Sequence, residues 1–100
     1  IVDARAVPVL PGAWEAADAC LYTAAGQRNR NHTGPFVRFE NVPFPMDEIL
    51  FDPQTSGGLL LAAASQKAEA LAQELRAAGL PAAIVGEIRD AQPTEITVKY

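Results

Sequence analysis

Internal disulfides are excluded in this chain, because Cys20 is its only cysteine. For the same reason, the chain alone cannot build a cysteine-based metal site. Long hydrophobic runs are also missing: the longest, Leu59 to Ala64, has 6 residues, whereas a membrane-spanning helix needs about 20. No signal peptide is recognisable, and the first residue is Ile1 rather than Met, so we expect a cut or processed piece.

An excess of positive charge is absent too. Eight Lys and Arg oppose 12 Asp and Glu, which gives a net charge of −4 and argues against nucleic-acid binding. Apolar residues make up 49% of the chain and charged residues 20%, a composition typical of folded soluble domains and not of disordered chains. With 100 residues and no repeat or linker, we expect one domain.

The basic residues are unevenly distributed. The segment from Cys20 to Phe39 contains no acid, while the rest of the chain carries all twelve acids and five of the eight Lys and Arg residues. Two interpretations stay open for this segment. It is either a solvated loop rich in Arg and Asn, or a loop that faces an anion, since a guanidinium group offers a fork of donors matched to phosphate oxygens. Its basic residues are Arg28, Arg30, His32 and Arg38.

Short elements broken by proline and glycine are predicted for the first half. Ala13–Leu21 has a helix-favouring composition and places Trp14, Ala17 and Leu21 on one face. In chain order we expect an edge strand or an extended entry at 2–10, that helix, a loop with one helical turn at most at 23–35, a strand at 36–39 and a short helix at 46–51.

The second half predicts a strand–helix–strand–strand order. Its helix, Gln66–Ala78, follows a favourable N-cap at Ser65 and ends before Gly79, which is suited to a left-handed stop. The apolar runs at 59–64 and 82–88 predict buried strands made parallel by a right-handed crossover. After a turn at 90–94, alternation at 95–100 predicts a half-exposed antiparallel strand. The fold class is therefore α+β, with a mixed β-sheet and helices packed in α/β layers, partly ferredoxin-like.

The least generic segment is Asp52-Pro53-Gln54-Thr55-Ser56-Gly57-Gly58. Paired glycines let a backbone or a ligand approach closely, and consecutive N–H groups can form an anion-binding nest. The segment is not a Walker A loop, because it lacks lysine and leads into an apolar run rather than a helix. A structural turn and a ligand-facing loop are both compatible with it, and Asp52 could bond locally toward Thr55.

This segment and its neighbours resemble the selenide, water dikinase family, also called selenophosphate synthetase. The run from Leu50 to Ala62 is similar to the family signature, and Gly26-Gln27-Arg28-Asn29-Arg30 is similar to its glycine-then-Arg-Asn loop. The family often has paired glycines before that loop, whereas Thr23-Ala24-Ala25-Gly26 stands here. Supporting similarity lies at Val7–Ala13, at Ala77–Gly79 and at Ile84–Ile88, so the resemblance covers nearly all 100 residues.

The resemblance implies an aminoimidazole ribonucleotide synthetase (AIR synthase) C-terminal-like domain of a two-domain, cytoplasmic, ATP-dependent transferase. Selenide, ATP and water would give selenophosphate, AMP and phosphate. The family's nucleophile, lysine and magnesium-binding aspartates belong to an N-terminal domain whose motifs are absent from these 100 residues. We therefore expect no catalytic or metal-binding residue in this chain, which should be inactive alone. ATP and Mg²⁺ would be bound mainly by that other domain, in an enzyme that is a homodimer at full length.

By the same resemblance, one set of residues would line the phosphate and nucleotide cleft between the two domains: Gln54, Thr55, Ser56, Gly57, Gly58, Arg28, Asn29 and Arg30. The two arginines are candidates to neutralise either phosphate or a neighbouring acid. Alternative hypotheses are a sister enzyme (AIR synthase, thiamine-monophosphate kinase or hydrogenase maturation dehydratase) and a stand-alone α+β binding or oligomerisation module. No nucleic-acid or membrane partner is expected.

For other residues with reactive, charged or aromatic side chains, we expect a structural role and no catalytic or binding one. Cys20 is expected to be a buried, inert thiol on an apolar helix face, and His32 an ordinary loop histidine without a second metal ligand at the right spacing. Lys67 and Lys99 fall on predicted solvent faces. Packing in the core or at an interface is expected for the aromatic residues Trp14, Phe36, Phe39 and Phe51.

Overall fold

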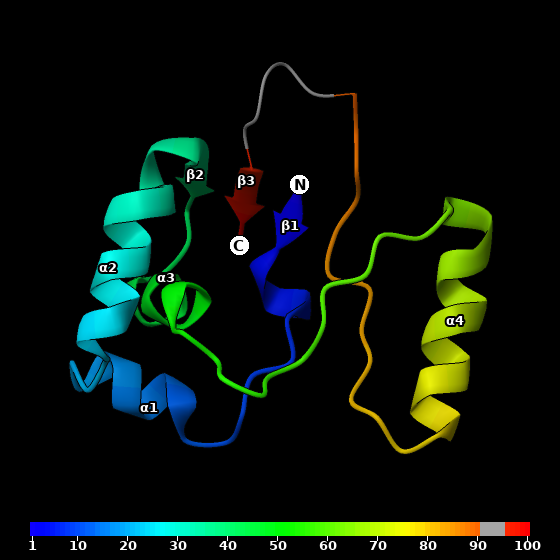
Figure 1. Ribbon diagram of the computed structural model, residues 1–100, viewed down its shortest axis with the longest axis horizontal. Coiled ribbons are helices and arrows are strands. Elements are labelled where there is room, and N and C mark those ends of the chain that lie inside the picture. Colours follow the sequence, from blue (N-terminus) through cyan, green and yellow to red (C-terminus); the bar gives the residue numbers. More distant parts are fainter. Residues whose placement is uncertain (91–95) are drawn as a thin grey trace.

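The structure is a computed structural model that describes residues 1–90 and 96–100 (Figure 1). Its strands are β1 (Val2–Asp3), β2 (Val37–Glu40) and β3 (Ile96–Lys99). Its α-helices are α1 (Ala13–Asp18), α2 (Ala24–Thr33), α3 (Phe44–Phe51) and α4 (Ser65–Ala77), and two short 3₁₀ helices cover Ala4–Ala6 and Gly34–Phe36. The expected α+β class is confirmed.

β3 is the central strand of the sheet, which has the order β1-β3-β2. It pairs parallel with both neighbours, so that Val98 lies between Val2 and Phe39. The predicted half-exposed antiparallel strand at 95–100 is therefore wrong for the part the structure describes. Thr97 and Val98, which are adjacent in β3, are both buried, at 8% and 4% exposure, so the burial of this strand does not alternate as the predicted pattern requires. The Thr97 hydroxyl accepts a hydrogen bond from Arg38 (3.3 Å), which satisfies its polar atom.

The core forms where α3 meets this sheet. Met46 of α3 packs with Ala4 and Val98, and α1 packs against α3. Partly buried side chains surround this centre: Val2, Val7, Trp14, Val37, Phe39, Val42 and Leu50. The predicted edge strand at 2–10 is reduced to β1, since a 3₁₀ helix begins at Ala4.

The strands predicted at 59–64 and 82–88 do not form, so the ferredoxin-like crossover is absent. Leu59 and Leu60 are more than four-fifths exposed. The second segment makes a single antiparallel bridge, between Gly86 and Val2, flanked by hydrogen bonds from Asp3 N to Val85 O (2.8 Å) and from Glu87 N to Ile1 O (2.9 Å). β1 is only two residues long, which leaves little edge for a further ladder. The sheet is thus parallel, with one antiparallel bridge where a mixed sheet was expected.

α4 lies to one side of the sheet in Figure 1. Gly79 has φ 82°, and Leu80 N donates to Leu75 O (3.0 Å), so the predicted left-handed stop is confirmed. The predicted N-cap at Ser65 is wrong by one position, because Ser65 is already helical and Ala64 is the N-cap. Within α4, only Ala72 is buried.

The Gly86 bridge gives a first prediction. A Cβ at Gly86 would overlap the Ile1 carbonyl oxygen and lie 3.0 Å from Val2 Cα, so Gly86→Ala should lower the free energy of unfolding by about 1–3 kcal/mol. Gly34→Ala is the matched control, because a Cβ there meets nothing within 4 Å and the φ of −51° suits alanine. Equal melting temperatures of the two variants would show that the bridge does not hold the N-terminus.

Candidate functional site

The segment Asp52–Gly58 is an exposed turn that follows α3. Two backbone hydrogen bonds close it, from Thr55 N to Pro53 O (3.2 Å) and from Gly57 N to Gln54 O (3.1 Å). Ser56 lies in the left-handed region at φ 60°. The local bond expected between Asp52 and Thr55 is replaced, because the Asp52 carboxylate accepts from the Thr23 hydroxyl (3.2 Å) instead.

Three polar side chains of this turn are available to a ligand. Gln54, Thr55 and Ser56 make no side-chain hydrogen bond with any residue that the structure describes, and all three are exposed. They offer an amide and two hydroxyls, groups that donate hydrogen bonds to phosphate oxygens.

The two glycines of the turn differ. A Cβ at Gly57 would lie 2.7 Å from Gln54 Cβ and 3.0 Å from Gln54 O, so glycine is required by the turn itself. A Cβ at Gly58 would meet nothing within 4 Å. The structure therefore explains Gly57 and leaves Gly58 without a structural reason.

The basic segment before α3 is a helix, so the predicted loop at 23–35 is wrong. Thr23 is the N-cap of α2, and its hydroxyl oxygen accepts from Gly26 N (3.0 Å). The signal for this helix was present: a threonine N-cap followed by two alanines, at the position where the family often has paired glycines.

Arg30 joins α2 to α3 through two carboxylates. Its guanidinium donates to Asp47 Oδ2 (3.0 Å) and to Glu48 Oε1 (2.6 Å), and lies 4.6 Å from the centre of the Phe51 ring. Gln27 donates to the other Glu48 oxygen (2.7 Å). Partial burial lowers the pKa of Arg30, but the hydrogen bond and charge of Asp47, with Glu48 adding to them, outweigh it and hold that pKa above its ordinary value.

The other two residues of the Arg-Asn motif differ, because only Asn29 has a hydrogen-bond partner in the described part of the chain. Asn29 donates through Nδ2 to Phe51 O (3.0 Å), the carbonyl immediately before the turn. Arg28 is exposed and forms no ion pair or hydrogen bond with the described part of the chain. Of the predicted cleft residues, the structure thus brings Asn29 and Arg30 to the start of the turn, while Arg28 remains free for an anion.

Several predictions about other residues are corrected. Cys20 is exposed, at φ 60°, because α1 ends at Asp18, and Leu21 is 73% exposed rather than on a helix face. His32 is exposed on α2 instead of in a loop. Phe36 is 56% exposed, so it does not belong to the core, and its packing at an interface stays a prediction.

Other aromatic and charged residues lie as expected. Trp14 contacts Tyr100 (ring centres 6.4 Å apart), Phe39 contacts Phe51 (5.6 Å), and Lys99 pairs with Glu40 (3.3 Å) on the surface. Among the described residues, no three His, Cys, Asp or Glu side chains gather as a metal site, and no helix is long and apolar enough to span a membrane.

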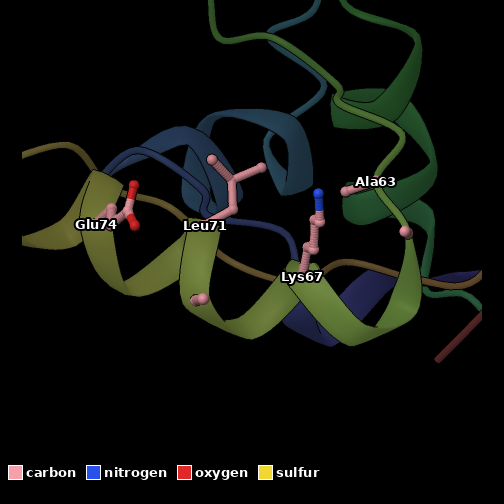
Figure 2. Close-up of a pocket in the computed structure, with 6 residues that line it drawn as sticks. Ala63, Lys67, Leu71 and Glu74 are labelled. Atoms are coloured by element: carbon pink, nitrogen blue, oxygen red, sulfur yellow. The ribbon is translucent and has the colours of Figure 1, made fainter.

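A hollow of about 520 Å³ lies between α4 and the chain leading into it. Figure 2 shows Lys67, Leu71 and Ala63 around it, with Glu74 further along the helix. The lining is mostly alanine and leucine, and its only charged groups are Lys67 and Glu74. Lys67 is the only side-chain hydrogen-bond donor in this lining, whereas the turn offers three free polar side chains, so we assign the candidate site to the turn.

Comparison of the sequence with known proteins places the chain in one family. The chain matches the family described as AIR synthase related protein, C-terminal domain, over residues 14–99, and it belongs to that family. It is 56% identical over 87 residues to a selenide, water dikinase of Agathobacter rectalis, covering 86% of this chain and 25% of the relative. It is 40% identical to a selenide, water dikinase of Desulfitobacterium hafniense, covering 94% of this chain and 28% of the relative. It is 43% identical to one of Pelobacter propionicus, covering 98% and 29%. The chain thus spans about a quarter of the length of these curated relatives, and the expected family resemblance is confirmed.

The Arg30 cluster gives a second prediction. Arg30→Gln should destabilise the domain by about 2 kcal/mol, because the Glu48 side chain, only 6% exposed, would lose its cationic partner. Arg28→Gln, on the same helix but without a partner among the described residues, should change stability by less than about 0.5 kcal/mol. Chemical denaturation of both variants measures the difference. If the two unfold at the same denaturant concentration, the ion pairs do not hold α2 to α3.

Proposed function

We propose that this chain is the C-terminal domain of a selenide, water dikinase, and that it forms one wall of the cleft in which phosphate groups of ATP react. The observation that carries this proposal is the exposed turn at 52–58. Its three free polar side chains and its unexplained Gly58 lie in the segment most similar to the family signature. The curated relatives that bear this name support the assignment.

The wall we propose consists of the turn and the neighbouring part of α2. Gln54, Thr55 and Ser56 would donate hydrogen bonds to phosphate oxygens, and Gly58 would let the phosphate or the opposite domain come close. The Arg28–Arg30 stretch borders this wall, with Arg28 able to add a positive charge. Stabilising the negative charge that develops during phosphoryl transfer is the main task in such chemistry.

Among the described residues, no three acidic or histidine side chains gather, and the proposal gives this chain no magnesium-binding role. The polar side chains of the turn suit phosphate, because they can donate hydrogen bonds to its oxygens. ATP would supply the phosphoryl group, and the turn would bind and orient it. Holding the metal, and supplying the nucleophile and the lysine, belong in this proposal to the N-terminal domain. A cytoplasmic location and a homodimer of the full-length enzyme are part of the proposal on the resemblance alone.

A separate N-terminal domain also accounts for apolar side chains that this chain leaves uncovered. Leu59, Leu60 and Leu61 follow the turn directly and are 87%, 81% and 54% exposed. Contiguous exposed apolar residues typically mark an interaction surface. A domain seated there would close the cleft over the turn.

The proposal predicts a division of activity between the two domains. The isolated 100-residue chain should not convert ATP to AMP with selenide, and the same chain joined to its N-terminal domain should. Selenophosphate formation, followed by phosphorus NMR, measures this. ATP hydrolysis by the isolated chain above the buffer background would contradict the proposed division.

The glycines of the turn give a sharper test within the full-length enzyme. Gly58→Ala should lower the selenophosphate-forming rate about tenfold without a change in melting temperature, since the new Cβ meets nothing in this domain. Gly57→Ala should lower both, because its Cβ meets Gln54. A Gly58→Ala enzyme of full activity would make the segment a structural turn only.

A further inference from the structure

The two motifs that stand apart in the sequence meet in the structure. The Thr23 hydroxyl donates to Asp52 Oδ1 (3.2 Å), and Asn29 Nδ2 donates to Phe51 O (3.0 Å). Between them on α2, a Cβ placed on the buried Gly26 would lie 3.6 Å from Phe51 O and 3.8 Å from Asp52 Cα, so the helix backbone lies against the start of the turn. The side chains of Thr23 and Asn29 thus hold Asp52 and Phe51, which are consecutive in the chain.

Those two residues are the point from which the turn leaves α3. Phe51, the last residue of α3, is 7% exposed, and its ring lies beneath the Arg30 guanidinium and against Phe39. Beyond Asp52, the hydrogen bonds that hold the turn within the described chain are its own two backbone bonds, and its polar side chains are free. The position of Gln54, Thr55 and Ser56 therefore depends on how Phe51 and Asp52 are fixed.

We infer that Thr23 and Asn29 are positioning residues for the phosphate-facing turn. This inference rests on the proposed function and adds to it a role for the Arg-Asn motif that does not require contact with phosphate. Thr23 fixes the Asp52 side chain, Asn29 fixes the Phe51 carbonyl, and together they set the direction of the turn. A displacement of about 1 Å at reacting groups costs on the order of 100-fold in rate.

Thr23→Asp in the full-length enzyme separates this role from helix stability. Aspartate is a good N-cap, so its carboxylate still accepts from Gly26 N. It cannot donate to Asp52, and it repels that carboxylate. We expect kcat to fall about tenfold, the KM for ATP to change less than about threefold, and the melting temperature to stay within a few degrees. Asn29→Asp, which removes the donor to Phe51 O without changing shape, should give the same pattern. Thr23→Ser, which keeps the donor, should retain kcat.

The double variant Thr23→Asp with Asp52→Asn supplies the decisive readout. The amide introduced at position 52 can donate to the carboxylate introduced at position 23, so the bond forms again with donor and acceptor exchanged. We expect kcat to recover to within about threefold of the unmodified enzyme, which a loss of helix stability alone would not allow.

Two outcomes would overturn the inference: no recovery of kcat in the double variant, or unchanged kcat in both single variants. Unchanged kcat in the single variants together with a slow Gly58→Ala enzyme would overturn it while the proposed function stands. A fully active Gly58→Ala enzyme would instead remove the functional role of the turn itself.

Discussion

The bridge that Arg30 makes between α2 and α3 is the interaction on which the rest of this site depends. One guanidinium forms ion pairs with two carboxylates, at 3.0 and 2.6 Å, and covers the Phe51 ring. A lysine could not do all three, because its ammonium is a point charge without a planar fork. This junction sets α2 beside the end of α3, and only then can Thr23 and Asn29 reach the start of the turn. Of the two arginines in the Arg-Asn motif, Arg30 thus has a structural role, while Arg28 has no partner among the described residues.

Features of this fold that depend on nearby residues could be predicted from the sequence, whereas features that depend on distant residues could not. The stop at Gly79, the helix before Asp52 and the turn itself depend on glycine, proline and capping residues, and they appear within a few positions of their predicted places. Pairing partners depend on distant residues. Alternation at 95–100 suggested a half-exposed antiparallel strand, but β1 and β2 both pair parallel with β3, and Thr97 is buried. Likewise, the partners of Arg30 on α3 could not be read from spacing along α2.

Within the turn, the structure separates two explanations that the sequence leaves together. Paired glycines suggest an unusual backbone conformation or the close approach of another group. From the sequence, either reason could apply to Gly57 and to Gly58. The contact of a Gly57 Cβ with Gln54 assigns that glycine to the backbone of the turn, whereas Gly58 has open space around it. Ser56, just before them, takes the left-handed conformation, although glycine would do so at lower cost. A serine at a place where glycine is easier supports the role that we propose for its hydroxyl.

The exposed leucines after the turn bear on the same question. A buried leucine stabilises a fold by about 1.5–3 kcal/mol relative to an exposed one, so Leu59 and Leu60 represent stabilisation that these 100 residues leave unrealised. The central strand predicted for these leucines does not form, because β1 ends after two residues and its Val2 already bridges to Gly86. In the function we propose, the apolar run is a surface that meets the N-terminal domain and not part of this domain's own core. Because that surface is directly continuous with Gly58, the proposal places the opposite wall of the cleft over the turn.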